Sequence, residues 1–291
     1  MSDPFRRRKV QCATLSGLHR MAYLEWGEPD NPRVLVCVHG LSRCARDFDT
    51  FAAAMAGEYR VVCPDVPGRG DSDWLSNPLE YAVPTYAGDM VTLIARLDVE
   101  TVHWVGTSMG GLIGMVLASL PDSPIARLVL NDVGPLVTAS SLQRIGAYIG
   151  KWPPLPTIEA AEQYLRAVSA SFGPHSDAQW RSLTEHVVRR QADGAWRMHY
   201  DPNIAVAFNA PGATDPEGRH RDIDLWPCYD AIRAPTLVVR GALSDLLTRE
   251  TARQMAERGP RARVVEIAGV GHAPTLMQPD QIAVVREFLL A

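Results

Sequence analysis

Six short apolar runs separated by other segments are the feature that most constrains how this chain of 291 residues folds. Each run is continuously apolar rather than alternating, which is typical of strands buried on both faces of a parallel sheet. The runs are "RVLVCVHG", "YRVVCPDVPG", "TVHWVG", "ARLVLNDVG", "PTLVVRG" and "ARVVEIAG". Segments with helical character, "DFDTFAAAMAG" and "TYAGDMVTLIARLD", lie between the first three. This alternation predicts βαβ crossover units, and hence an α/β fold with a mostly parallel sheet flanked by helices.

The segment that precedes these runs has a different pattern. "ATLSGLHRMAYLEWG" is typical of two strands joined by a Ser-Gly turn, so we expect an antiparallel edge and eight strands in all. The basic run from Arg6 to Lys9 is short, and no apolar signal-peptide segment follows it. We therefore expect a solvated, frayed terminus there.

The regular alternation stops between residues 136 and 222, a stretch that we name the cap segment. "KWPPLP" interrupts it, and two amphipathic stretches follow, beginning at Thr157 and Ser176, both of which can cap a helix. The strand pattern resumes at Thr236. We predict a helical cap subdomain inserted between strands 6 and 7 of the sheet, with residues 1–135 and 223–291 forming the core domain.

Composition narrows the classes of partner. The chain is 46% hydrophobic and 21% charged, with a net charge of −4 and a pI of about 6.1. This balance gives no electrostatic reason to expect nucleic acid or an anionic membrane as a partner. No apolar run is long enough to cross a bilayer. The five cysteines are odd in number and lack the spacing of metal ligands, which favours a reducing cytoplasm.

Ser108 stands between Gly106 and Gly110 in "HWVGTSMGGLIGMVLASLP", a stretch that begins like a strand and ends like a helix. A serine hydroxyl becomes a nucleophile when a base, usually His, takes its proton and a carboxylate orients that base. His272 follows the run "RVVEI", and Asp245 follows "TLVVRG". Because the carboxyl ends of parallel strands share one edge of a sheet, we expect these three side chains to meet there.

These motifs together resemble the α/β-hydrolase fold family. The Gly-Thr-Ser-Met-Gly sequence matches its nucleophile elbow, His39-Gly40 matches the motif after its third strand, and "PGRGDSDW" is similar to the loop after its fourth. The resemblance implies a nucleophile at Ser108, a base at His272, an acid at Asp245, and no cofactor or metal.

The backbone N–H groups of Leu41 and Met109 are the oxyanion donors that this resemblance implies. The elbow places Met109 at the start of a helix, and Leu41 follows the His39-Gly40 turn. Asp132, directly after "RLVLN", is a rival for the acid, because some family members carry it at that strand end. If Asp245 is the acid, Asp132 is structural and binds loop N–H groups.

Serine rather than aspartate at position 108 argues against haloalkane dehalogenase and epoxide hydrolase chemistry. The leading expectation is hydrolysis of a carboxylic ester (a small ester, a lactone or a hydroxyalkanoate oligomer) through an acyl-enzyme. Alternatives are a hydrolase of a carbon–carbon bond in a diketone, a perhydrolase or cofactor-free haloperoxidase, and a ligand receptor on this scaffold. The carbon–carbon hydrolase would need an inward arginine such as Arg43. Arg43 and Arg46 follow the oxyanion turn closely and are candidates for binding a substrate carboxylate, but we expect both to be solvated surface residues. The oligomeric state stays open.

Overall fold

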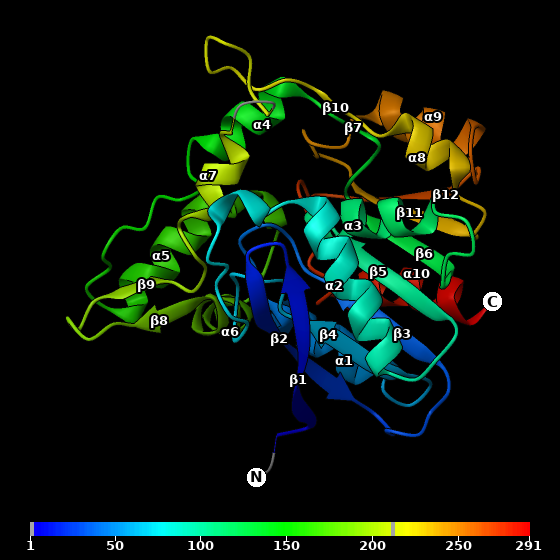
Figure 1. Cartoon of the computed structure of the whole chain (residues 1–291), viewed down its shortest axis with the longest axis horizontal. Helices are drawn as coiled ribbons and strands as arrows, with labels where there is room; N and C mark the ends of the chain where they lie inside the picture. The colour runs from blue at the N-terminus through cyan, green and yellow to red at the C-terminus, as the bar shows by residue number, and fades with distance from the viewer. Residues whose placement is uncertain (1–2, 211–212) are drawn as a thin grey trace.

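An eight-stranded sheet forms the centre of the protein in a computed structural model that describes residues 3–210 and 213–291 (Figure 1). Its spatial order is β1-β2-β4-β3-β5-β6-β11-β12. The strands are β1 (Phe5–Thr14), β2 (Gly17–Trp26), β3 (Val34–Val38), β4 (Arg60–Pro64), β5 (Val102–Thr107), β6 (Ile125–Asn131), β11 (Thr236–Gly241) and β12 (Arg263–Ile267). Strand β2 runs antiparallel to β1 and β4, and the other neighbours are parallel. The predicted α/β class with a mostly parallel sheet is confirmed.

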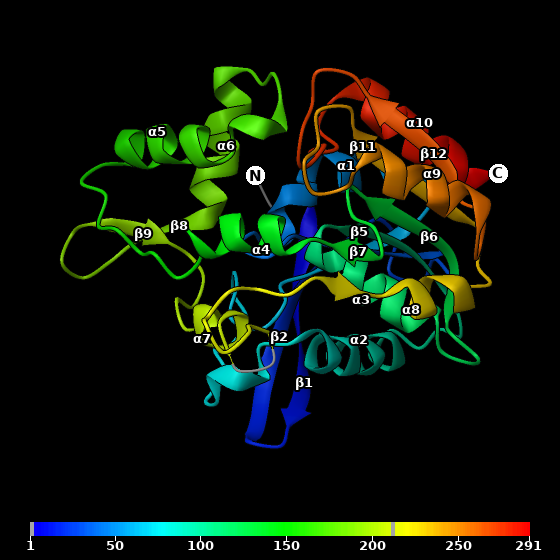
Figure 2. The same cartoon turned by 90° about the horizontal axis from the view of Figure 1, so that it is seen from above.

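Helices cover both faces of the sheet, which explains why a central strand such as β3 is apolar throughout. In β3, Val36 packs into one core cluster, whereas Leu35 and Cys37 pack into the other. The first cluster includes residues of α2 (Val83–Arg96), α3 (Met109–Ala118), α8 (Trp226–Ala231) and α9 (Arg249–Glu257). The second includes residues of α1 (Asp49–Met55) and α10 (Pro279–Leu290). Figure 2 shows α2 and α3 on one side of the sheet and α10 on the other.

The basic run from Arg6 to Lys9 lies in a strand, so the expectation that it is frayed is wrong. Arg6 to Lys9 belong to β1, which pairs with β2 from Phe5 opposite Trp26 onward. The Arg6 guanidinium donates to the Glu25 carboxylate at 2.9 Å. The basic run is held in β1 by pairing with β2, and nothing in the composition of the run itself predicts a strand.

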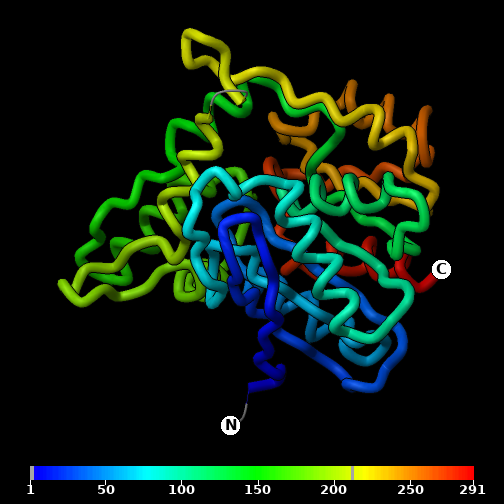
Figure 3. The backbone as a smooth tube through the Cα atoms, viewed as in Figure 1, coloured from blue at the N-terminus to red at the C-terminus, as the bar shows by residue number. Residues whose placement is uncertain are grey.

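The cap segment lies between β6 and β11, the sixth and seventh strands of the sheet along the chain. Its elements are α4 (Ala139–Gly146), α5 (Ile158–Val168), the short 3-10 helix η3 (Ala170–Phe172), α6 (Asp177–Val187), β8 (Val188–Arg190), β9 (Trp196–Met198) and α7 (Ile204–Phe208). Figures 1 and 3 show most of these elements gathered beside the sheet. At its base, β7 (Leu136–Val137) pairs with β10 (Ile223–Asp224). We propose the cap segment as a separate subdomain because this pairing joins the points where the chain leaves and returns.

The capping residues of the cap segment act as the sequence suggests. Thr157 accepts a hydrogen bond from the Ala160 N–H, and Ser176 accepts one from the Gln179 N–H. The second amphipathic stretch is helical only as far as Val187. Strand β8 begins at the next residue and pairs with β9. Across the described residues, no helix combines the length and apolar character that a membrane crossing requires.

Candidate active site

Ser108 occupies the turn between the end of β5 and the start of α3. Its φ of +52° and ψ of −115° lie in a region that residues with a side chain rarely adopt. Its N–H donates to the Asn131 carbonyl at 3.0 Å, and its own carbonyl accepts from the Gly111 and Leu112 N–H groups. These bonds hold the strained turn, so the serine hydroxyl leaves the sheet at its carboxyl edge.

Glycine is required on both sides of the turn because backbone atoms approach too closely for a side chain. A Cβ at Gly106 would lie 2.2 Å from the Gly110 carbonyl oxygen. A Cβ at Gly110 would lie 2.0 Å from the carbonyl oxygen of Val38 on β3. The spacing of the two glycines is thus a packing requirement of the strand–turn–helix unit.

We expect Gly110→Ala to lower the free energy of unfolding by about 3 kcal/mol or more, because neither α3 nor the central strand β3 can move away cheaply. Urea denaturation measures this loss. Gly88→Ala is the matched control: it lies inside α2 with nothing within 4 Å of the added Cβ, and we expect a gain of about 0.5–1 kcal/mol. Equal stability of Gly110→Ala and the unmodified protein would contradict the close approach.

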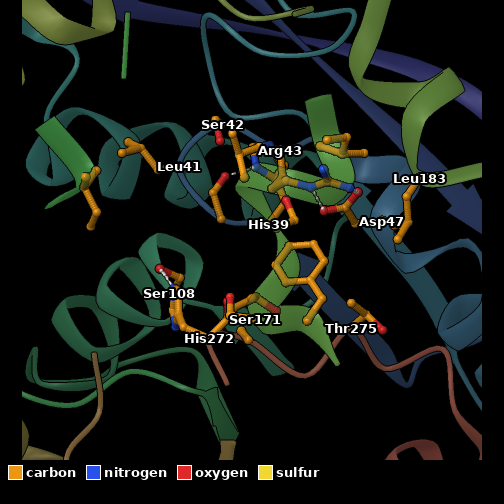
Figure 4. A pocket seen from close by; sticks show the side chains of 18 of the residues that line it. His39, Leu41, Ser42, Arg43, Asp47, Ser108, Ser171, Leu183, His272 and Thr275 are labelled. Carbon is orange, nitrogen blue, oxygen red and sulfur yellow. Dashed lines mark hydrogen bonds and ion pairs between the residues drawn. The ribbon is translucent and has the colours of Figure 1, made fainter. Parts of the chain in front are cut away.

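His272 lies in the loop after β12 and contacts Ser108. Its Nε2 is 3.0 Å from the Ser108 Oγ, and its Nδ1 is 2.7 Å from Oδ2 of Asp132 (Figure 4 shows the first of these contacts). A carboxylate only accepts, so Nδ1 carries the proton and Nε2 is free to accept from the serine hydroxyl. The structure therefore joins Ser108, His272 and a buried carboxylate in one hydrogen-bonded chain.

That carboxylate is Asp132, and the expectation that Asp245 orients His272 is wrong. Asp132 directly follows β6 and is fully buried. Its Oδ1 accepts from the Gly241 N–H at 2.8 Å, and its Oδ2 accepts from the Ser244 hydroxyl at 2.6 Å as well as from His272. Asp132 thus also binds the N–H of Gly241, the last residue of β11, rather than the loop N–H groups expected of it if it were only structural.

Asp245 instead lies at the surface, with 57% of its side chain exposed, and pairs with Arg144 at 2.9 Å. It stands four residues beyond the last residue of β11, Gly241, and the loop turns its carboxylate toward the cap segment. Ser244, one position earlier, is the residue that reaches Asp132. The sequence signal that could have identified the acid is the position of Asp132 immediately after β6, the strand that follows β5 along the chain.

The His39-Gly40-Leu41 turn lies against the elbow, and a Cβ at Gly40 would lie 3.7 Å from that of Ser108. The buried His39 ring accepts from the Val66 N–H at 3.0 Å and donates to the Gly40 carbonyl at 2.7 Å. Burial lowers the pKa of His39 to about 3, so this neutral ring keeps both bonds at ordinary pH.

The backbone N–H groups of Leu41 and Met109 have no acceptor among residues 3–210 and 213–291. The buried Arg69 guanidinium contacts both residues: Nε donates to the Leu41 carbonyl at 2.8 Å, and Nη2 lies 3.6 Å from the Met109 sulfur. Its Nη1 donates to the Tyr86 hydroxyl. Sequence reasoning placed Arg69 in the loop after the fourth strand and missed this role in fixing the two residues.

Two cavities meet at Ser108, with Leu41 and Ile145 also lining both. The first includes His272 and the inner surface of α5 and η3. The second lacks His272 and is mainly apolar, with Met109, Leu112, Leu142, Ile204 and Phe208 among its walls. Residues of the cap segment line both cavities.

Arg43 lies in the wall of the first cavity, so the expectation of a solvated surface arginine is wrong for it. Only 9% of the residue is exposed. Its Nε and Nη2 donate to the two carboxylate oxygens of Asp47, each at 2.7 Å. Figure 4 shows this pair across the cavity from Ser108. Arg46 is partly exposed and pairs with Asp49.

The loop of His272 is tied to the cap segment. The Gly271 N–H donates to the Ser171 carbonyl at 2.7 Å, and the Ser171 hydroxyl donates to the His272 carbonyl. His175 contacts the Thr275 hydroxyl at 2.8 Å. The segment around η3 thus holds the loop in the position at which His272 contacts the serine.

Comparison with known proteins agrees with this fold. The family model described as alpha/beta hydrolase fold matches residues 33–277. The chain is 54% identical, over 99% of both chains, to a 3-hydroxybutyrate-oligomer hydrolase of Cupriavidus necator. It is 28% identical to an esterase of Mycobacterium tuberculosis, over 93% of this chain and 84% of that protein. A solved alpha/beta hydrolase of Novosphingobium aromaticivorans superposes with a TM-score of 0.87 at 36% identity, covering 100% of this chain and 99% of the other. The chain belongs to the α/β-hydrolase fold family.

Proposed function

We propose that this protein hydrolyses carboxylic esters through an acyl-enzyme on Ser108. The observation that carries this proposal is the hydrogen-bonded chain from Ser108 through His272 to the buried Asp132. His272 takes the serine proton as Oγ attacks the ester carbonyl, and Asp132 stabilises the imidazolium that forms. The free N–H groups of Leu41 and Met109 donate to the oxyanion.

The second half of the reaction uses the same groups. His272 protonates the departing alcohol oxygen as its bond to the acyl carbon breaks. Water then attacks the acyl-enzyme, His272 takes a proton from that water, and the free acid leaves while Ser108 regains its proton. No step requires a cofactor or a metal.

The substrates that we propose are short linear oligomers of a 3-hydroxy acid. The relative of Cupriavidus necator, 54% identical over nearly the full length, is named for hydrolysis of 3-hydroxybutyrate oligomers. Cavities on both sides of Ser108 suit a substrate that extends in two directions from its scissile ester. The partner is thus a small acyl compound, and the five free cysteines fit a cytoplasmic location.

Carbon–carbon bond hydrolysis of a diketone is the second candidate, because that chemistry calls for an inward polar anchor and Arg43 lines the first cavity. The 54% identity to a 3-hydroxybutyrate-oligomer hydrolase favours the ester candidate.

Steady-state turnover on a substrate panel tests the function. We expect repeated hydrolysis of 3-hydroxybutyrate dimer and trimer, with kcat/KM about tenfold or more above that for a vinylogous diketone. A tenfold ratio corresponds to a difference of about 1.4 kcal/mol in the free energy of the transition state. p-Nitrophenyl butyrate and a small lactone complete the panel. Faster cleavage of the diketone would favour the second candidate. Release of one equivalent of product per protein, with no further turnover, would indicate a receptor.

A further inference from the structure

The two cavities at Ser108 differ in their relation to His272. His272 must protonate the oxygen of the departing alcohol, so that alcohol has to lie on the side of the serine where the imidazole is. The first cavity contains His272, whereas the second does not. The first cavity is therefore the place of the leaving alcohol, and the second is the place of the acyl group.

The chemistry of a linear hydroxy-acid oligomer then fixes which of its ends lies in each cavity. When the Ser108 Oγ forms its bond to an ester carbonyl carbon, the bond from that carbon to the alkoxy oxygen breaks. The fragment held on the serine ends in the free hydroxyl of the oligomer. The fragment that leaves, protonated by His272, carries the oligomer's free carboxylate. The carboxylate end must thus occupy the first cavity.

Arg43 and Arg144 are the two arginines that line the first cavity, and Arg43 is the buried one, whereas Arg144 is 47% exposed and pairs with Asp245. Its guanidinium is buried, and its Nη1 has neither solvent contact nor a hydrogen-bond partner within the described part of the chain. Asp47 engages only Nε and Nη2. The Phe172 ring of η3 lies over the guanidinium, with its centroid 5.6 Å from Cζ. A buried donor without an acceptor is uncommon, and a ligand carboxylate would supply the acceptor that this one lacks.

We propose that Arg43 anchors the carboxylate end of a hydroxy-acid oligomer, so that the oligomer binds in one direction with its hydroxyl end in the second cavity. The proposal rests on the proposed function and identifies the free carboxylate of the oligomer as the group that the site recognises. The apolar walls of the second cavity, such as Leu112 and Leu142, match the hydrocarbon parts of the acyl fragment.

Asp47 moderates this anchor. Its carboxylate neutralises the guanidinium and would repel a second carboxylate on the same residue. Substitution of Asp47 by asparagine keeps a hydrogen-bond acceptor beside Arg43 while removing the charge. The two residues should therefore act in opposite directions on a substrate with a free carboxylate.

Kinetics on 3-hydroxybutyrate trimer, as the free acid and as its methyl ester, test the proposal. We expect the unmodified protein to prefer the free acid about tenfold or more in kcat/KM. Arg43→Met should remove this preference, mainly by raising KM for the acid, and Arg43→Lys should keep part of it. Asp47→Asn should increase the preference several-fold. Arg46→Met is the matched control, because Arg46 lies one turn away and pairs with Asp49; it should leave the ratio unchanged.

Each outcome decides between distinct failures. If Arg43→Met keeps the preference for the free acid, the anchor is wrong. If Arg43→Met does not fold, Arg43→Lys and Asp47→Asn carry the test, and an unchanged acid-to-ester ratio in both overturns it. Equal cleavage of acid and methyl ester by the unmodified protein overturns the anchor and leaves the proposed hydrolysis of oligomers intact. Hydrolysis of p-nitrophenyl butyrate with no cleavage of either trimer overturns the proposed substrate, and the anchor with it.

Discussion

Ser108→Ala is expected to lower kcat on the best ester substrate by about 10⁴-fold or more, because no other group can form the acyl-enzyme. The remaining rate would come from the oxyanion donors Leu41 and Met109 and from substrate binding. Alanine at the same φ of +52° has the same backbone strain as serine, so the melting temperature should change little. Single-turnover measurements with purified variant, free of unmodified protein, give the residual rate.

Substrate binding is the control for this substitution. Because the hydroxyl is small and both cavities persist, the alanine variant should still bind the trimer with a Kd near the KM of the unmodified protein, as titration calorimetry can measure. Retention of more than a few per cent of kcat would show that Ser108 is not the nucleophile.

Asp132→Asn is expected to lower kcat by about 10⁴-fold, because the amide removes the charge that stabilises the imidazolium and favours the wrong tautomer of His272. Asp245→Asn should change kcat by about twofold at most, because its pair with Arg144 is exposed and such pairs contribute little. Steady-state kinetics on the same ester compare the two variants directly.

Asp132 also binds the Gly241 N–H and the Ser244 hydroxyl, so a structural effect has to be separated from a catalytic one. Ser244→Ala removes one of these bonds and leaves the contact with His272 intact. We expect it to cost some thermal stability while kcat falls far less than in Asp132→Asn. A larger loss in Asp245→Asn than in Asp132→Asn would return the acid to Asp245.

Most of the sheet was predictable because its signals are local. A strand buried on both faces needs apolar side chains on both, and β3 shows this at all five of its positions. The elbow was predictable for the same reason, since Gly106 and Gly110 relieve contacts within one strand–turn–helix unit. Ser108 directly follows β5, and the loop after β12 carries His272, so the parallel order of the sheet brings both to one edge.

The acid was not predictable in this way. Asp132 and Asp245 both follow apolar strands, and the difference between them is the direction in which a loop turns a side chain. Asp132 is fixed at once by the end of β6, whereas Asp245 lies further along its loop and meets Arg144 of the cap segment. The burial of Arg43 likewise depends on Phe172, which is far away in the sequence.

The bonds between the cap segment and the loop of His272 have a consequence for how substrate enters. Any hinge motion that lifts η3 from the sheet would break the contacts of Ser171 with Gly271 and His272, and would thereby release the base from the serine. The cap segment could then not be open while His272 acts on Ser108. Such an enzyme would form the acyl-enzyme only when the cap segment is closed. Nucleophiles other than water would then have little access to it.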